Sequence, residues 1–299
     1  MAALHQKSLA NLRPNNTRPN RLASKVPVKS RGQRLVVRAG TLDPGATVLV
    51  AGATGGVGQL VCAKLIERGF KVKAVARPRS AKALEGYGPN LQVVQADLKD
   101  PTAVGSLFGD IEAIVCATGT TAFPSERWNG NNGPRPTDWE ANANLINIAA
   151  GAMKASGGNL ARFLLVTSAG VERQKELPWA ILNLFGVLKY KRDAEELLMK
   201  SGLPWTIIRP SRLTDGPYTS FDLNTLLQAT AGSRQDVTLS LSDSLAGEAS
   251  RIAVAEAVVQ ALTCSQSENK AFALSSKDGE GPGTDETKWK TLFANAQLY

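Results

Sequence analysis

The sequence predicts an α/β fold in which a parallel β-sheet carries helices on both of its faces. Short, continuously apolar segments alternate with longer amphipathic segments between residues 47 and 210, and a glycine-rich turn joins the first apolar segment to the first amphipathic one. The composition, with 43% hydrophobic and 6% aromatic residues, is that of a globular chain. Strands that are apolar along their whole length are typical of sheets buried on both faces, so we expect a doubly wound sheet.

The individual elements are predicted from the spacing of apolar residues along the chain. Continuous apolar runs predict strands at residues 47–51, 71–76, 91–96, 113–117, 162–167, 205–209 and 271–275. Amphipathic segments predict helices at residues 58–68, 80–85, 101–107, 139–155, 189–200, 251–263 and 286–296. Beyond Pro210 the alternation becomes irregular. We therefore expect a small, loop-rich C-terminal lobe for a substrate or a partner, formed mainly by residues 211–250 and 276–299.

The formal net charge of +9 comes from the first 40 residues. Nine of the 35 basic residues precede Asp43, which is the first acidic residue. Residues 41–299 therefore contain 26 basic and 26 acidic residues and are electrically balanced. A basic face that grips nucleic acid loses its main support, and we expect no nucleic-acid partner.

The basic leader predicts where the protein goes. Residues 1–39 are rich in Arg, Ser, Asn and Pro, and they contain no acid and no continuous apolar core. This composition is typical of a disordered plastid transit peptide, with cleavage near Arg38 or Ala39, and residues 40–299 would form the mature domain. We expect a chloroplast protein, either in the stroma or peripheral to the thylakoid membrane. A basic arm that stays attached and binds anionic surfaces is the alternative.

The scarcity of histidine and cysteine excludes several catalytic classes. The single histidine, His5, lies in the leader, so the mature domain lacks the imidazole of serine and cysteine hydrolases and of histidine metal sites. Cys62, Cys116 and Cys264 are far apart in sequence, and we expect neither a disulfide framework nor a metal site. No apolar run approaches the roughly 18–20 residues that span a bilayer.

The turn Gly52-Ala-Thr-Gly55-Gly56-Val-Gly58 is the main candidate for a ligand site. It lies between the first predicted strand and the first predicted helix, which is the context that a dinucleotide-binding motif requires. Glycines permit the tight turn and let backbone N–H groups approach a pyrophosphate at the positive end of the helix. No Gly-Lys-Ser/Thr follows, so the loop that binds triphosphates is excluded.

The residues after the second and third strands indicate which dinucleotide binds. NAD-binding sites usually place Asp or Glu after the second strand, whereas this chain has Arg77. An arginine there would pair with a 2′-phosphate, so we expect NADP(H) and regard NAD as less favoured. Arg79 and Lys82 are weaker candidates that also suit a solvated helix start. Asp97 is placed to accept from the adenine amino group, or else to serve as a turn or cap residue.

Further motifs, taken in order, resemble the atypical short-chain dehydrogenase/reductase family, in particular the plant NAD(P)-binding members related to NmrA-like proteins. After the glycine turn they are Asp97-Leu98, Ala117-Thr-Gly119, Asp138-Trp139 with Asn144, Thr167-Ser168, Lys191-Arg-Asp-Ala-Glu195 and Ile207-Ile-Arg-Pro210. The resemblance covers about residues 46–296 and implies a Rossmann-type sheet. It also implies cofactor contacts from Gly52, Thr54, Gly55, Gly56, Val57, Gly58, Arg77, Asp97, Leu98, Ala117, Thr118, Gly119, Lys191 and Pro210.

The catalytic residues of that family are matched only in part. The family uses a tyrosine and a lysine four residues apart, together with a serine after the fifth strand. Lys191 and Ser168 match the lysine and the serine, whereas the tyrosine position is Val187. Tyr190 is turned about 100° away from Lys191 along a helix. Three functions remain open: a tyrosine-independent reductase of a planar acceptor such as a quinone or a flavin, an NADP(H)-sensing regulator, and a thylakoid-associated assembly or scaffold protein.

Two segments bear on this choice. The loop of residues 120–138 follows the fourth strand, and its Phe123, Arg127 and Trp128 could cap a planar substrate or could belong to a packed surface loop. Residues 178–188 are unusually apolar. Packing of a helix against the sheet is the default interpretation. Covering the nicotinamide pocket and docking on a membrane surface are the alternatives.

Overall fold

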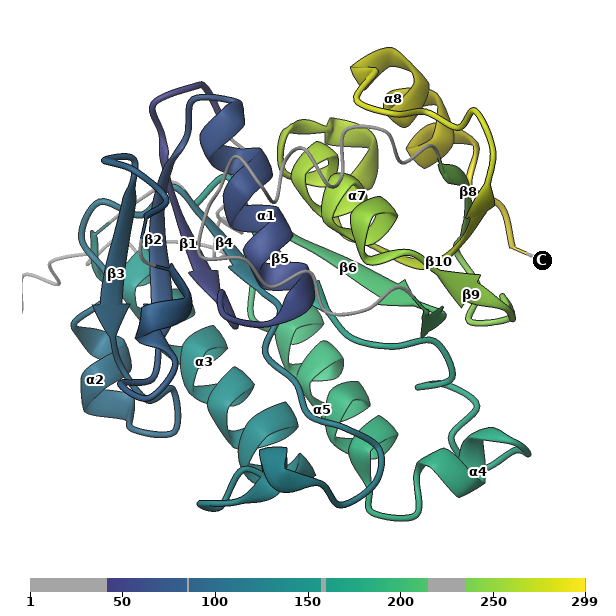
Figure 1. Cartoon of the computed structure of the whole chain (residues 1–299), viewed down its shortest axis with the longest axis horizontal. Coiled ribbons are helices and arrows are strands. Elements are labelled where there is room, and N and C mark those ends of the chain that lie inside the picture. Colours follow the sequence, from purple (N-terminus) through teal and green to yellow (C-terminus); the bar gives the residue numbers. More distant parts are fainter. Residues whose placement is uncertain (1–41, 85, 157–159, 215–234, 299) are drawn as a thin grey trace, which may run out of the picture. The chain divides into compact units, whose positions relative to one another are not determined.

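An eight-stranded sheet is the centre of the domain in the computed structural model (Figure 1), which describes residues 42–298 except 85, 157–159 and 215–234. Seven neighbouring strands run parallel, and β8 pairs antiparallel with β10. In spatial order the strands are β3 (Leu91–Gln95), β2 (Lys71–Ala76), β1 (Thr47–Ala51), β4 (Ala113–Cys116), β5 (Arg162–Val166), β6 (Trp205–Pro210), β10 (Lys270–Asp278) and β8 (Gln235–Ser240).

Helices cover both faces of the sheet, as the apolar strands predict. One face packs against α1 (Gly56–Glu67), α7 (Arg251–Thr263) and α8 (Glu286–Asn295). The other face packs against α2 (Pro101–Gly105), α3 (Ala141–Ser156) and α5 (Val187–Lys200).

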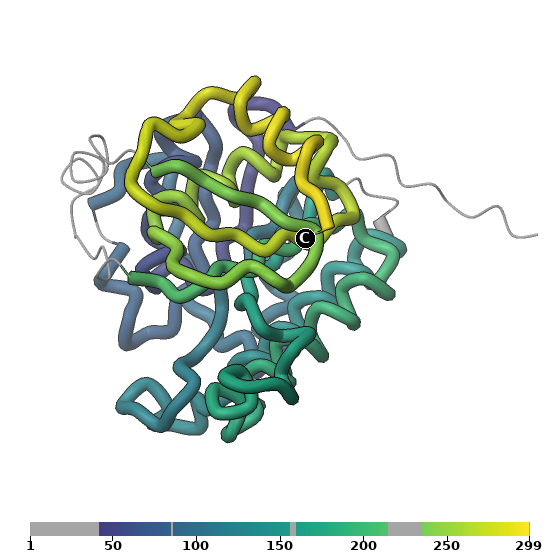
Figure 2. The backbone as a smooth tube through the Cα atoms, turned by 90° about the vertical axis from the view of Figure 1, so that its right-hand side faces the viewer, coloured from purple at the N-terminus to yellow at the C-terminus, as the bar shows by residue number. Residues whose placement is uncertain are grey.

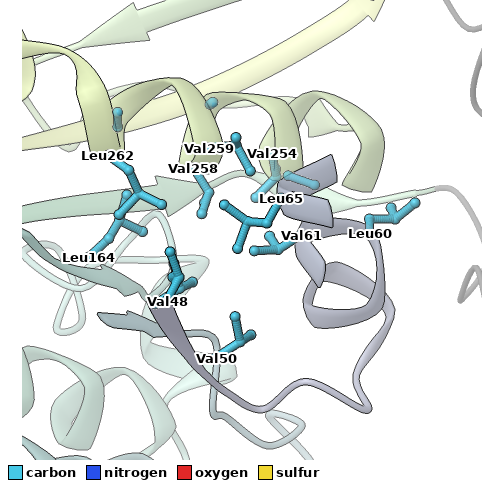
Figure 3. Packing of buried hydrophobic residues seen from close by; sticks show 14 of the residues in the cluster. Val48, Val50, Leu60, Val61, Leu65, Leu164, Val254, Val258, Val259 and Leu262 are labelled. Carbon is cyan, nitrogen blue, oxygen red and sulfur yellow. The ribbon is translucent and has the colours of Figure 1, made fainter. Parts of the chain in front are cut away.

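The packing of α1 against α7 shows why these segments are helices of the core. Figure 3 shows Val61 and Leu65 of α1 facing Val254 and Val258 of α7, close to Val48 of β1. All five side chains are fully buried. The doubly wound fold class is therefore confirmed.

The strand order places a crevice at the middle of the sheet. From β1 the chain winds outward to β2 and β3, then returns to β4 on the other side of β1 and winds outward again to β5 and β6. The connections leaving β1 and β4 therefore turn to opposite faces of the sheet. Ligands of open α/β sheets bind at this reversal, outside the carboxyl ends of the strands.

The C-terminal part differs most from the prediction. Strand β8 lies in a stretch that we expected to be irregular. Its polar residues alternate with apolar ones, and it pairs at an edge of the sheet that is only partly buried, so it lacks the continuous apolar run of the other strands. Strands β7 (Arg212–Leu213) and β9 (Glu248–Ala249) form a second, two-stranded sheet. These elements, coloured green to yellow, face the viewer in Figure 2. The predicted leader and residues 215–234 lie outside the described residues, so the division into leader, domain and lobe stays a prediction.

The apolar segment before α5 is the second difference. It forms the short helix α4 (Trp179–Leu182), and the default expectation that its apolar residues pack on the sheet is wrong. Leu184 is 72% exposed and Ile181 is 57% exposed. Trp179 faces inward, where its ring closes on Gly170, which has φ +89° and no room for a Cβ.

Candidate functional site

A cavity of about 330 Å³ lies at the crevice between β1 and β4. The four connections after β1, β2, β3 and β4 contribute to its wall, together with the start of α3. The residues that line it are Gly52, Thr54, Gly55, Gly56, Val75, Ala76, Arg77, Ser80, Ala96, Asp97, Leu98, Lys99, Ala117, Thr118, Gly119, Thr120, Arg127, Asn132, Thr137 and Ala141. Most of the predicted cofactor residues are brought together here, whereas Val57, Gly58, Ser168, Lys191 and Pro210 do not line the cavity.

The glycine turn is shaped by close backbone contacts. Gly52 has φ +75°, and a Cβ there would lie 2.6 Å from the carbonyl oxygen of Ala117. A Cβ at Gly58 would lie 2.1 Å from the carbonyl oxygen of Gly52, so Gly58 serves the packing of α1 against the turn. Gly55 and Gly56, which open α1, line the cavity. The positive end of the α1 dipole is therefore at the cavity wall, where an anion is stabilised.

The connections after β2 and β3 form the opposite end of the cavity. Arg77 is exposed and lines it, and the neighbouring Ser80 donates a hydrogen bond from Oγ to the Arg77 carbonyl over 3.1 Å. Arg79 and Lys82 are exposed and do not line the cavity. Asp97 Oδ1 accepts a hydrogen bond from the Lys99 backbone N–H over 3.0 Å. Asp97 therefore stabilises its own turn while remaining on the cavity wall.

The loop of residues 120–138 is fastened across this end of the cavity. Lys99 Nζ donates to the Asn131 carbonyl over 3.2 Å and to Asn132 Oδ1 over 3.1 Å. Trp128 donates from Nε1 to Thr121 Oγ1 over 3.1 Å. Arg127 and Asn132 line the cavity, whereas Phe123 and Trp128 do not.

Phe123 and Trp128 contact the apolar segment instead. Both rings meet Phe185 edge-on, with centroid separations of 6.4 Å and 5.5 Å. The loop and α4 therefore lie at the same end of the domain, which is the lower end in Figure 1 and Figure 2. For Phe123 and Trp128, the interpretation as part of a packed surface loop therefore applies, and not the one in which they cap a planar substrate.

Lys191 is held by a buried aspartate beyond the cavity wall. Its Nζ lies 2.6 Å from Asp138 Oδ1, and Asp138 is fully buried. The same oxygen accepts from the Thr120 backbone N–H over 3.3 Å. A Cβ at Gly119 would lie 2.6 Å from Lys191 Nζ, so the ammonium lies directly behind a residue of the cavity wall.

Asp138 reaches this position through an unusual backbone turn. Residues Arg135–Glu140 form a π-helical turn before α3, and such turns are frequent at functional sites. Burial raises the pKa of Asp138, and the charge and hydrogen bond of Lys191 oppose the rise. The tyrosine position is Val187, which is buried against Val171 and Leu188.

Three buried polar atoms, on Asp138 and on the two neighbours of Gly119, lack a hydrogen-bond partner among the described residues. They are Asp138 Oδ2, Thr118 Oγ1 and Thr120 Oγ1. Buried polar groups are normally paired, so these atoms point to a ligand with hydroxyl or amide groups. The ribose and carboxamide of a dinucleotide carry such groups. Together with the glycine turn, the cavity fits an NAD(P)H cofactor.

The remaining predicted catalytic residue, Ser168, points its hydroxyl to its own segment. Ser168 Oγ donates to the Ala169 carbonyl over 3.0 Å. The segment is anchored by Asp243, which is buried and accepts from the backbone N–H groups of Gly170 and Glu172 over 2.7 Å and 2.8 Å. The structure thus leaves Ser168 outside the cavity wall.

Two motif residues of the resemblance belong to a separate buried ion cluster. Arg209 Nε and Nη2 donate to the two carboxylate oxygens of Glu195 over 3.0 Å and 2.8 Å. Arg209 Nη2 also lies 2.9 Å from Glu172 Oε1, and Thr167 Oγ1 donates to Glu195 Oε1 over 2.6 Å. This cluster ties α5 to the ends of β5 and β6.

Sequence reasoning did not assign Asp138, Ser80, Lys99 or Asn132 to the site. Asp138 was visible only as part of the Asp-Trp motif. Its partner Lys191 is 53 positions away, so no local pattern links them. For Lys99, the only signal in the sequence was its position two residues after Asp97.

No helix in the described parts of the chain has the length and apolarity to cross a membrane. Residues 42–298, with the gaps given above, also hold no cluster of three or more His, Cys, Asp and Glu side chains suited to a metal ion.

A protein family described as NAD(P)H-binding matches residues 52–265. The chloroplastic protein TIC 62 of Pisum sativum is 37% identical over 227 residues, which are 70% of this chain and 39% of the pea protein. This chain thus spans about two fifths of the length of that relative. The sanguinarine reductase of Eschscholzia californica is 32% identical over 282 residues, covering 83% of this chain and 95% of the reductase.

A solved structure supports the fold. The oxidoreductase ylbE of Lactococcus lactis matches with a TM-score of 0.59 and 18% identity, over 85% of this chain and 99% of ylbE. At this identity the likeness concerns the fold alone. The chloroplast localisation predicted for this chain is confirmed by chloroplastic relatives such as the pea protein.

Proposed function

The chain belongs to the NAD(P)H-binding family, and from this premise we propose that it is an NADP(H)-dependent oxidoreductase without a catalytic tyrosine. Its substrate would be a planar acceptor such as a quinone or a flavin. One observation carries the proposal: Lys191 is held by Asp138 behind the cavity wall, beside buried hydroxyls without partners, while the tyrosine position is an apolar Val187. A planar acceptor that takes a hydride into a delocalised ring system does not depend on a phenol for its proton.

The preference for NADP(H) over NAD is part of the proposal. Arg77 and Ser80 stand at the end of the cavity where a 2′-phosphate would be recognised. The only acidic residue that lines the described cavity is Asp97, which follows β3 and not β2. An arginine there pairs with a phosphate, whereas an NAD site needs a carboxylate for the ribose hydroxyls.

The remaining contacts follow from the cavity wall. The turn from Gly52 to Gly58 would hold the pyrophosphate, with Thr54, Gly55 and Gly56 on the wall and Val57 behind it. Asp97 and Leu98 would flank the adenine. Ala117, Thr118 and Gly119 would face the nicotinamide ribose with Lys191, and Pro210 would lie toward the nicotinamide ring. A bound NADPH would supply the hydride, and Lys191, beside Gly119, would orient the ribose and hold a proton at Nζ. Ser168 would contact the acceptor.

The activity test is NADPH oxidation with a panel of quinones and flavins. Lys191→Met removes the ammonium, and we expect kcat to fall about a hundredfold, which is a usual contribution of a proton-transfer group. Lys189→Met is the matched control, because Lys189 lies on the same helix with its side chain 56% exposed and paired with Asp193. The control should keep wild-type activity. An absence of oxidation above buffer with every acceptor would remove the proposal.

A partner-binding protein, either an NADP(H)-sensing regulator or a thylakoid-associated assembly protein, is the second candidate function. The observation in its favour is an exposed apolar patch, which we define as Phe123, Leu177, Ile181, Leu184 and Phe185. Apolar patches of this kind often mark interaction sites. Sedimentation with thylakoid membranes, with NADP⁺ or NADPH added, tests it. Binding that Leu184→Asp abolishes supports this function, and a protein that stays in the supernatant under both conditions contradicts it.

Import into the chloroplast through residues 1–39 completes the proposal. N-terminal sequencing of the protein purified from chloroplasts should start near Ala39. A chain in the organelle that still begins with Met1 would contradict a cleaved transit peptide.

A further inference from the structure

The pair of Lys191 and Asp138 differs from an ordinary buried ion pair because half of the carboxylate has no partner. Oδ1 receives the Lys191 ammonium and the Thr120 N–H. Oδ2 is buried and has no hydrogen-bond partner among the described residues. An unpaired oxygen on a fully buried carboxylate is costly, and protonation or a ligand removes the cost.

Among the described residues, the groups that face Asp138 offer a single cation. Lys191 comes from α5, and its charge is the one that lowers the pKa of Asp138. From β4 comes Cys116, whose thiol donates to Asn142 Oδ1 over 3.1 Å and stays neutral because burial raises its pKa. From α3 comes Asn142, whose Nδ2 donates to the Asp138 carbonyl over 3.0 Å. The charge of Asp138 therefore depends on the position of the Lys191 ammonium.

We propose that Asp138 is a positioning residue for Lys191 and that binding of the dinucleotide adds a proton to this pair. The inference rests on the cofactor site proposed above. The ligand brings negative charge to the cavity, excludes water from it and draws the ammonium of Lys191 away from the Asp138 carboxylate. Each of these changes disfavours the ionised carboxylate.

The proton comes from the solvent and forms an O–H bond on the Asp138 carboxyl group. The pair then changes from a net charge of zero to a net charge of one positive unit, carried by Lys191. A positive pair complements an anionic ligand better than a neutral pair does. The fixed carboxyl group also keeps Lys191 Nζ behind Gly119 before the ligand arrives.

Proton uptake is measurable in this protein because few other groups titrate near neutrality. Residues 40–299 contain no histidine, which is the side chain that normally titrates between pH 5 and 8. The 2′-phosphate of NADPH titrates at about pH 6 and would release protons on pairing with a cation, which is the opposite sign. NADH lacks this phosphate, so titrations with NADH report the protein alone.

The experiment is calorimetric titration at pH 6.5 in three buffers of different ionisation enthalpy, with NADPH and with NADH. The slope against ionisation enthalpy gives the number of protons bound per ligand. We expect the wild type to take up about 0.3 proton or more with NADH, and Asp138→Asn to take up none. With NADPH the two proteins should differ by the same amount. Glu140→Gln is the matched control, because Glu140 lies on the same π-helical turn and pairs at the surface with Arg135. It should behave as the wild type.

The outcomes separate this inference from the proposed function. If neither dinucleotide binds the wild type, the proposed cofactor site fails. If NADH binds the wild type without proton uptake, the cofactor site stands and the proton linkage is overturned, whatever the variants do. Equal uptake by the wild type and Asp138→Asn also overturns it. Lys191→Met provides a second variant: its Asp138 lacks a counterion in both states and is already protonated, so we expect no uptake.

Discussion

Two buried ion pairs involve residues of the same helix, α5, one turn apart, and they differ in how completely the hydrogen-bonding capacity of their carboxylates is used. Glu195 of α5 has both carboxylate oxygens bonded to Arg209, and Thr167 adds a third bond. Lys191 of α5 meets Asp138, whose second oxygen has no partner among the described residues. Buried polar networks that are fully satisfied stabilise and specify a fold, whereas a half-satisfied one is costly.

The positions of the two pairs explain this difference. The Arg209 cluster closes the junction of α5 with the ends of β5 and β6, away from the cavity wall. The Asp138 pair lies behind Gly119, which lines the cavity. We infer that the first pair belongs to the scaffold and that the second pair belongs to the site, where a ligand completes it.

The largest expected effect is on the scaffold pair. Arg209→Met removes both bonds of the buried guanidinium to Glu195 and leaves it only the partly exposed Arg192, at 3.2 Å, as a cationic partner among the described residues. We expect the free energy of unfolding to fall by about 3–5 kcal/mol. Urea denaturation measures the loss. Arg212→Met, at an exposed pair with Glu248, should change it by less than about 0.5 kcal/mol. A loss at Arg209 as small as that of the control would contradict a scaffold role.

The site pair should contribute less to stability and more to binding. Asp138→Asn leaves the Lys191 ammonium with a weaker acceptor beside the cavity, and we expect a loss of about 1–3 kcal/mol in unfolding free energy. NADPH affinity should rise in this variant, because its pair with Lys191 is already positive before the ligand arrives, while folded Arg209→Met keeps wild-type affinity. The comparison breaks if Asp138→Asn destabilises as much as Arg209→Met and leaves NADPH affinity unchanged.

These contrasts show what sequence reasoning could reach. The position of the glycine turn and of Arg77 on the cavity wall was predictable, because each follows directly from a short local context, between a strand and a helix or just after a strand. The parallel core was predictable from its continuous apolar strands. The pairs of Lys191 with Asp138 and of Arg209 with Glu195 were not, because each depends on how α5 is oriented against distant segments. The predictions for α4 and for strand β8 were wrong for a related reason: the apolarity of a segment does not show which of its surfaces other elements cover.

Acid titration separates two buried carboxylates with opposite pKa shifts. Burial raises the pKa of Glu256, but the charges and hydrogen bonds of Lys64, at 2.9 Å, and of Arg68 lower it by more. The pKa of Glu256 therefore lies below its ordinary value of 4.5. The contribution of Glu256 to stability is therefore present above pH 4.5 and is lost as the pH falls through the lowered pKa.

Asp138 has the opposite sign. Its pKa is raised by burial from the ordinary value of 3.8, so its contribution is present below pH 3.8 and is lost as the pH rises through the raised pKa. Between pH 6 and pH 3, the stability deficit of Glu256→Gln should shrink, whereas that of Asp138→Asn should grow. Urea midpoints measured across this range would contradict the assignment if both deficits changed in the same direction.

The smallest expected effect on stability concerns Arg77, whose removal should leave the free energy of unfolding unchanged and alter only the choice of dinucleotide. Calorimetric titration of the wild type and of Arg77→Ala with NADPH and NADH is the most direct test of the claim that this cavity is an NADP(H) site. We expect the wild type to prefer NADPH, and Arg77→Ala to bind NADPH about 10–100-fold more weakly with its NADH affinity unchanged. Equal wild-type affinities for the two dinucleotides, or an Arg77→Ala protein that keeps the preference, would contradict it.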